Sequence, residues 1–182
     1  VTTGVKDSSG NTLSSLYETT NGFLGGYLEQ EAYVKSVNRP NNNMMFGDSV
    51  AIEKDTIAVG ADYERSNQRT ITNGATAASD STAYNGAVYV YTRDNTSWSQ
   101  QAYIKPSNAQ QTSAYFHYFG FSNSLENDTL AVGAQCDYSN QQSITNSDSA
   151  ASTNTSSVGS GAVFVYTRSG NNWSQQSYIK AS

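Results

Sequence analysis

Acidic residues are spaced along two long polar segments in a way that could supply oxygen ligands to a hard cation. They are Asp62, Glu64 and Asp80 in residues 62–85, and Asp137 and Asp148 in residues 135–160. Calcium takes about six to eight oxygen ligands, many of them from loops. Because the carboxylates form no compact calcium loop, we expect no cofactor and keep calcium as an alternative. The other interpretation of both segments is a solvated flap without a ligand.

The stretch "AYFHYFG" at residues 114–120 concentrates ring-bearing side chains. The candidate ligand or interface residues within it are Tyr115, Phe116, Tyr118 and Phe119. Packing against a neighbouring sheet would explain them. A platform for sugar rings is the alternative, since aromatic faces suit the apolar faces of sugars.

Residues capable of covalent or acid–base catalysis are few. His117 is the single histidine and Cys136 the single cysteine, and neither has a local catalytic partner in the sequence. The chain contains no G-x-S-x-G elbow, phosphate-binding glycine loop, CxxC pair or HExxH motif. We therefore predict a protein that is not an enzyme, with a two-carboxylate hydrolase as the third alternative.

An internal repeat organises these residues. "FGDSVAIEKDTIAVGA" at residues 46–61 returns as "FGFSNSLENDTLAVGA" at residues 119–134, 73 positions later. "GAVYVYTR" at residues 86–93 returns as "GAVFVYTR" at residues 161–168, and a fainter echo of the unit's last strand lies at residues 26–35. The predicted organisation is an N-terminal partial blade or exchanged strand at 1–27, a first repeat at 28–105 and a second at 106–182.

Each repeat reads as four antiparallel strands. In the first repeat these are residues 49–53, 56–61, 86–93 and 98–105, separated by turn signals such as "KD" and "DNTS". Strict alternation would place Trp98, Gln100, Ala102 and Ile104 on one face of the last strand. Arg93 and Arg168 stand at matching strand ends, which favours a structural role such as pairing with a turn carboxylate or covering apolar surface with their stems. Asp55 and Asp128 recur at the hairpins, where a side-chain hydrogen bond that fixes the turn is expected. Helix signals are nearly absent, so the fold class is all-β, with four-stranded propeller-type blades.

The repeated motifs resemble the FG-GAP β-propeller repeats of integrin α-subunit heads and secreted bacterial proteins, and the bacterial variety most. The resemblance is carried by Phe46-Gly47 and Phe119-Gly120, Gly60-Ala61 and Gly133-Ala134, and Gly86-Ala87 and Gly161-Ala162. It implies a non-catalytic structural or adhesive interaction module. Integrin-type blades often carry a D-x-D-x-D-G calcium loop, which this sequence lacks at the corresponding positions.

The number of repeats predicts association. Propellers have 4–8 blades, and this chain has about two and a half. Two stacked blades would leave sheet faces and edges open. Further blades of the same protein, other copies of the chain, or closure into a smaller sandwich would each cover them. We expect self-association or further blades, with a glycan or protein ligand as the alternative.

Composition narrows the partners and the location. The formal charge of −5 repels phosphate backbones, so nucleic acid is not expected as a partner. No apolar run reaches the roughly 20 residues that span a bilayer. The surface is rich in Asn, Ser and Thr and poor in Lys, which favours an extracellular or cell-surface location.

Overall fold

The computed structural model describes residues 30–37, 44–66, 68–77, 84–110, 116–147 and 159–181. The chain divides into two compact units, Val1–Glu31 and Ala32–Ser182, and the strands of the described residues lie in the second. All elements of the described residues are strands, so the all-β prediction is confirmed. None of these residues forms a helix long and apolar enough to cross a membrane. The predicted partial blade or exchanged strand at 1–27 lies outside the described residues.

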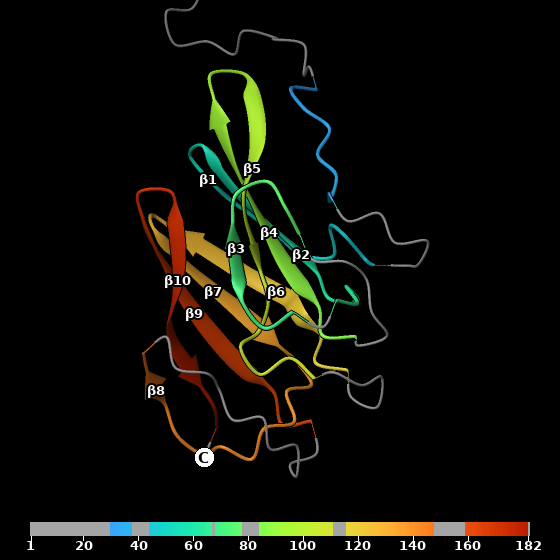
Figure 1. The fold of residues 1–182 in the computed structure, drawn as a ribbon, viewed down its shortest axis with the longest axis vertical. Helices are drawn as coiled ribbons and strands as arrows, with labels where there is room; N and C mark the ends of the chain where they lie inside the picture. The colour runs from blue at the N-terminus through green and yellow to red at the C-terminus, as the bar shows by residue number, and fades with distance from the viewer. Residues whose placement is uncertain are drawn as a thin grey trace, which may run out of the picture. The chain divides into compact units, whose positions relative to one another are not determined.

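The first repeat forms a five-stranded antiparallel sheet with the order β1-β2-β4-β5-β3 (Figure 1). Its strands are β1 (Val50–Glu53), β2 (Thr56–Ala61), β3 (Ile71–Asn73), β4 (Ala87–Asp94) and β5 (Ser97–Ile104). Alternating β-branched and aromatic residues favour these strands. The tight turns bend at Lys54 and Asn95, which both adopt positive φ angles. We call this the first sheet.

The second repeat forms a sheet of the same design, with the order β6-β7-β9-β10-β8. Its strands are β6 (Phe119–Glu126), β7 (Thr129–Ala134), β8 (Thr145–Asn146), β9 (Ala162–Ser169) and β10 (Asn172–Ile179). The turn residues Asn127 and Gly170 have positive φ, as Lys54 and Asn95 do in the first sheet. The repeated sequence therefore specifies a repeated sheet.

Each sheet has one strand more than the four predicted. The long segment after β2 returns along the outer side of β5, where Ile71 pairs with Ile104 and forms β3. In the second sheet, Thr145 pairs with Tyr178 and forms β8. These strands have three and two residues, so their sequence signal is too short to stand out from the polar segments. The antiparallel architecture is as predicted, but the count of four strands is not.

A β-bulge changes the faces of the last long strand. In β5 the register shifts at Gln101, because Gln100 pairs with Tyr91 and Ala102 pairs with the preceding residue, Val90. The prediction that Trp98 and Ala102 share a face is therefore wrong. An extra residue on one strand inverts the alternation beyond it.

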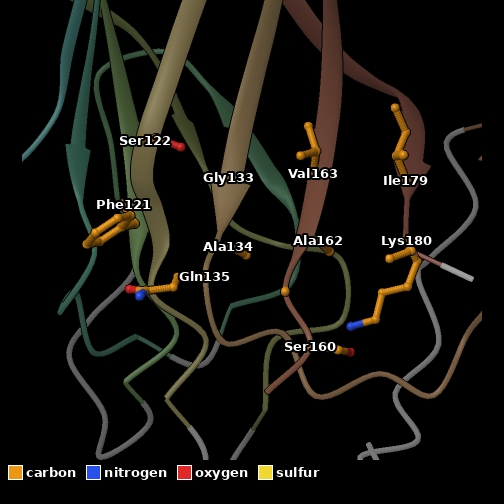
Figure 2. Close-up of a pocket in the computed structure, with 12 residues that line it drawn as sticks. Phe121, Ser122, Gly133, Ala134, Gln135, Ser160, Ala162, Val163, Ile179 and Lys180 are labelled. Atoms are coloured by element: carbon orange, nitrogen blue, oxygen red, sulfur yellow. The ribbon is translucent and has the colours of Figure 1, made fainter. Parts of the chain in front are cut away.

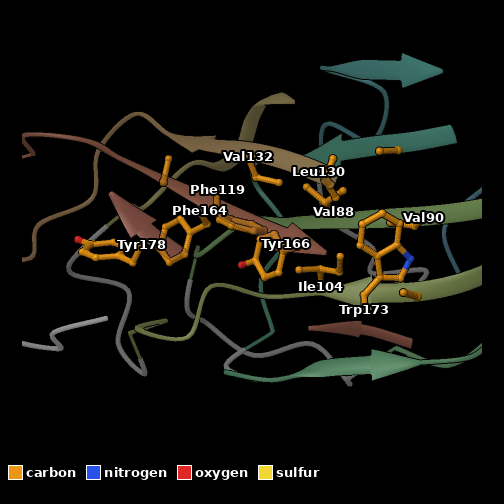
Figure 3. Close-up of a cluster of buried hydrophobic side chains, with 13 residues drawn as sticks. Val88, Val90, Ile104, Phe119, Leu130, Val132, Phe164, Tyr166, Trp173 and Tyr178 are labelled. Atoms are coloured by element: carbon orange, nitrogen blue, oxygen red, sulfur yellow. The ribbon is translucent and has the colours of Figure 1, made fainter. Parts of the chain in front are cut away.

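The two sheets stack through unlike faces, which together form one core (Figure 3). The first sheet contributes its aliphatic face, which consists of Ala58, Val88, Val90, Ala102 and Ile104. The second sheet contributes its aromatic face, which consists of Phe119, Phe164, Tyr166, Trp173 and Tyr178. The rings of Phe119 and Phe164 meet edge to face with centroids 5.2 Å apart. Burial of large aromatic surfaces supplies most of the stabilisation of such a contact.

The first sheet has its own aromatic face on the opposite side, formed by Phe46, Tyr89, Tyr91, Trp98 and Tyr103. Val34 and Met44 pack against this cluster. The Tyr91 hydroxyl also donates a hydrogen bond of 2.9 Å to the carbonyl oxygen of Lys35. Residues preceding β1 therefore cover part of this face.

Candidate functional site

The aliphatic face of the second sheet is open. It consists of Ala131, Val163, Val165, Ser177 and Ile179, the repeat equivalents of the aliphatic face of the first sheet. Val88 and Ile104 are fully buried, whereas their equivalents Val163 and Ile179 are 39% and 38% exposed. The face adjoins a hollow of about 550 Å³ that Phe121, Val163 and Ile179 line (Figure 2). The aliphatic face is therefore exposed to solvent in the second sheet, whereas the equivalent face of the first sheet is buried in the core.

Polar contacts fix the register between the stacked sheets. Trp173 Nε1 donates to Gln101 Oε1 at 2.8 Å, and its backbone N–H donates to Asn73 Oδ1 at 2.9 Å. Arg168 Nη1 donates to Gln101 Oε1 at 3.2 Å and to Thr56 Oγ1 at 3.1 Å. One glutamine of the first sheet therefore accepts from both an indole and a guanidinium of the second.

The equivalents of the three accepting residues lie on the second sheet. Gln176, Asn146 and Thr129 correspond to Gln101, Asn73 and Thr56, and all three are exposed. The hydrogen-bond acceptors of the stacking interface are therefore repeated on the second sheet, beside its open aliphatic face.

The two arginines pair with hairpin carboxylates, which is one of the two structural roles expected of them. Arg93 donates to Asp55 Oδ1 through Nε at 2.8 Å and Nη2 at 2.7 Å, and Arg168 Nε donates to Asp128 Oδ1 at 2.7 Å. Their guanidinium groups lie over the rings of Trp98 and Trp173. Repetition at equal strand positions predicted this structural role correctly.

Lys105 and Glu64 form an ion pair in the interior, with both side chains fully buried. Glu64 Oε1 also accepts the backbone N–H of Ser66 at 3.1 Å, and the Ser66 hydroxyl shares a hydrogen bond of 2.6 Å with Tyr103. A buried charge is tolerated only when it is paired and hydrogen-bonded. The pair therefore fastens the segment after β2 to the end of β5.

Asp137 is the equivalent centre in the second repeat. Its carboxylate accepts from Lys180 Nζ at 2.8 Å, Tyr178 OH at 2.8 Å and Asn108 Nδ2 at 2.7 Å. Burial alone would raise the pKa of Asp137, but the hydrogen bonds from Lys180 and Asn108 outweigh it and lower this pKa. The carboxylate is held as an anion by its neighbours.

His117 lies beside this centre, with Nδ1 3.6 Å from Asp137 Oδ2. The imidazole is fully buried, and neither ring nitrogen has a hydrogen-bond partner among the described residues. Burial lowers the pKa of His117 to about 4, and the charges of Lys105 and Lys180 act in the same direction. The ring is therefore neutral at pH 7. No repeating partner carboxylate for His117 is evident in the sequence, but folding brings Asp137 to it.

The predicted aromatic candidates separate into two environments. Phe119 lies in the core between the sheets, so no external ligand can reach it without unstacking them. Phe116 and Tyr118 are partly exposed and stack with centroids 5.8 Å apart. Tyr84 and Tyr63 extend this group, with Tyr84 4.8 Å from Phe116 and Tyr63 5.2 Å from Tyr118. Tyr115 lies outside the described residues.

The predicted metal ligands that the structure describes, Asp62, Glu64 and Asp137, do not form one metal site. Glu64 and Asp137 are each paired with a lysine of their own repeat, and Asp80 and Asp148 lie outside the described residues. Asp62 is buried, and burial, with the nearby Asp48 carboxylate, raises its pKa to about 6. Within the described residues, no three His, Cys, Asp or Glu side chains are grouped to hold a metal ion. Calcium binding stays a prediction.

The sequence contained a signal for the buried ion pairs that was not used. Glu64 and Asp137 are 73 positions apart, as the neighbouring motifs are, and Lys105 and Lys180 are 75 apart. When an acidic residue and a basic residue recur together in both repeats, the recurrence indicates an ion pair within each repeat. The polar segments were instead interpreted as solvated flaps, with metal or ligand binding as the alternative.

Comparison with known families supports this architecture. Residues 40–75, which include β1, β2 and β3, match the FG-GAP repeat family. No curated protein matches the chain. The match covers the Phe46-Gly47 and Gly60-Ala61 motifs on which the resemblance was based. The chain therefore carries a repeat of the FG-GAP family.

Proposed function

We propose that this chain is a non-catalytic, extracellular structural and adhesive module of β-propeller type that binds further sheets of its own kind. The open aliphatic face of the second sheet is the observation that carries the proposal. Its equivalent in the first sheet is covered completely by an aromatic face. A contiguous exposed apolar surface with a polar rim is typical of protein interaction sites.

The binding partner is a second copy of the chain. Both aliphatic and aromatic faces occur in each copy, so one molecule carries the two chemistries that stack within it. FG-GAP repeats generally serve interaction rather than catalysis and are typically found in extracellular proteins, which agrees with the composition. Adhesion would then depend on sheet stacking between molecules.

Sedimentation velocity over a range of concentrations tests this proposal. We expect the wild-type chain to associate at tens of micromolar and Ile179→Asp to abolish association, since a charge on the open face must be desolvated on stacking. Val37→Asp is the control, because Val37 is also exposed but does not line the hollow. A wild-type chain that stays monomeric, or equal effects of the two variants, would contradict the proposal.

A second candidate function is glycan binding at the group formed by Tyr63, Tyr84, Phe116 and Tyr118. Four partly exposed rings converge there, and the guanidinium of Arg65 lies 4.6 Å above the Tyr84 ring. Such rings can stack on the apolar faces of sugars. A glycan array tests it: binding that disappears in Tyr118→Ala while the fold is retained would support a lectin-like role, and an array without signal would exclude it.

A further inference from the structure

The stacking interface contains a built site for a Phe-Gly dipeptide. Phe119 and Gly120 of β6 lie against Gly86 and Gly60 of the first sheet. The backbone N–H of Phe119 donates to the Asn85 carbonyl oxygen at 3.1 Å. A Cβ atom on Gly60 would overlap the Gly120 carbonyl oxygen, and one on Gly86 would overlap that of Phe119. Glycine is therefore required for the approach of the two backbones.

A serine completes the site. Ser49 Oγ donates to the Gly120 carbonyl oxygen at 2.6 Å, and Asn123 Nδ2 donates to the same hydroxyl at 2.7 Å. The Phe119 ring enters the core between the sheets, with its centroid 6.2 Å from that of Tyr166. Backbone, hydroxyl and ring contacts together recognise an aromatic residue followed by glycine.

The same receiving site recurs on the second sheet. Gly133, Gly161, Ser122 and Ser160 are the equivalents of Gly60, Gly86, Ser49 and Asn85, and they line the hollow of Figure 2. A Cβ atom on Gly161 would meet only the second sheet itself, at 3.1 Å from the Gln135 carbonyl oxygen. The site is continuous with the established interface, because β6 carries both Phe119 and Gly120, which are buried against the first sheet, and Ser122, which is exposed and lines the hollow.

The inserting segment also recurs, on the first sheet. Phe46 packs edge to face on Tyr89 and Tyr91 at 5.4 and 6.4 Å, as Phe119 packs on Phe164 and Tyr166. Gly47 has a φ of 99°, close to the 91° of Gly120. Gly47 is exposed and has open space around its Cα, whereas Gly120 lies against Ala87 and Val88.

Apolar side chains flank the Phe46–Gly47 segment, in which Phe46 is half-buried and Gly47 is exposed. Val50 and Ile52 of β1 are 59% and 63% exposed, and they pair with Val59 and Ile57 on the aromatic face. Their equivalents on β6 are Asn123 and Leu125, of which Leu125 packs into the core between the sheets. The first sheet therefore exposes a Phe-Gly segment equivalent to Phe119–Gly120. The second sheet exposes a site equivalent to the one that binds Phe119–Gly120.

We propose that the site around Gly133 and Gly161 receives the Phe46–Gly47 segment of a second copy. The inference rests on the proposed self-association and names the contact that produces it. Ser122 Oγ would donate to the Gly47 carbonyl oxygen, and the Ser160 carbonyl oxygen would accept from the Phe46 N–H. The contact is confined to this segment and β1, because Val34 and Met44 already cover other parts of the aromatic face. Because the two surfaces differ, the assembly is head-to-tail and forms rings or filaments.

Complementation between two full-length variants tests the proposal. Ile52→Asp blocks the inserting side and keeps the receiving site, whereas Gly161→Val blocks the receiving site and keeps the inserting side. We expect each variant to sediment as a monomer and an equimolar mixture to form a 1:1 dimer that grows no further. Association of Ile52→Asp alone to the wild-type extent would overturn the proposal, as would a mixture of two folded variants that stays monomeric.

A peptide experiment gives an answer even if Gly161→Val does not fold. A labelled synthetic peptide of residues 44–53 is titrated with the wild-type chain and followed by fluorescence anisotropy. We expect saturable binding that weakens at least tenfold when the peptide carries Phe46→Ala or Gly47→Val, and no selectivity among the three peptides would overturn the proposal. If Ile179→Asp abolishes self-association while these peptides and variants have no effect, the proposed function stands and the Phe-Gly contact is wrong.

Discussion

Gly86 and Phe119 form a parallel β-bridge that joins the two sheets, although they belong to different repeats. Gly86 has a φ of 78°, and its equivalent Gly161 has a φ of 75°, so an alanine is strained similarly at both positions. The two glycines differ in their surroundings, because only Gly86 lies against the backbone of another sheet. This difference allows the stacking contact to be measured separately from backbone strain.

We expect Gly86→Ala to destabilise the chain by about 1–3 kcal/mol more than Gly161→Ala, the usual cost of forcing extra atoms into a packed contact. Urea denaturation of both variants, followed by tryptophan fluorescence, measures the difference. Equal losses in the free energy of unfolding would show that the second sheet does not press against Gly86.

Gln101 and Gln176 provide a second matched pair. Gln101 Oε1 accepts from Trp173 Nε1 and Arg168 Nη1, whereas Gln176 is the exposed equivalent on the second sheet. Gln101→Ala should cost about 1–3 kcal/mol, since it leaves the indole donor without its acceptor. Gln176→Ala should stay within about 0.5 kcal/mol in the monomer. Thermal unfolding at low protein concentration compares them, and a larger effect at Gln176 would contradict the assignment of the stacked face.

The buried pair of Lys105 and Glu64 should behave as a unit. Lys105→Met leaves a carboxylate in the interior without its cation, which costs about 3–5 kcal/mol. Adding Glu64→Gln removes that charge and should recover part of the loss, because Gln can still accept from the Ser66 N–H. A double-mutant cycle in urea gives the coupling between the two changes. Strictly additive losses would mean that the two charges do not stabilise each other.

Much of the fold could be predicted from the repeat. Recurrence of "GAVYVYTR" and of the Phe-Gly and Gly-Ala motifs correctly predicted two equivalent antiparallel sheets, because each sheet needs the same apolar strand at the same place. A structural role for Arg93 was expected for the same reason, and its guanidinium pairs with Asp55. Local periodicity failed at Gln101, where one extra residue in β5 inverts the faces of the strand.

The site was harder to predict because its residues meet only after folding. His117 and Asp137 are 20 positions apart in sequence, and nothing local indicates that the imidazole lies beside the carboxylate. Phe119 was grouped with its aromatic neighbours, for which packing against a neighbouring sheet was expected and a sugar platform was the alternative; β6 turns its ring into the core between the sheets. Val88 is buried and Val163 is exposed, although both are valines at equivalent positions. The difference arises only because another sheet stacks on the first sheet at that face, which the local sequence does not indicate.

His117 should make the stability of the chain depend on pH. Its pKa is about 4 in the folded chain, well below the ordinary value of about 6.5. In the unfolded chain the imidazole binds a proton as pH falls below about 6.5, while the buried imidazole stays neutral until about pH 4. The free energy of unfolding should therefore fall over this range by about 3 kcal/mol from this residue, since each unit of pKa corresponds to about 1.4 kcal/mol.

His117→Met isolates this contribution, because Met44 occupies the equivalent buried position in the first repeat. The charged groups that act on His117 are Asp137, Lys105, Lys180 and Arg69, and all remain in the variant. Asp62 affects the pH dependence in the opposite sense, because its pKa is raised to about 6 in the folded chain. Its contribution to the free energy of unfolding is lost as pH rises through about 6. This contribution is the same in the wild type and the variant, so it does not affect their difference. We expect the stability of the variant relative to wild type to rise by about 3 kcal/mol between pH 7 and pH 4. Urea titrations at half-unit pH steps measure this, and parallel curves for the two proteins would show that the imidazole is not held neutral in the interior.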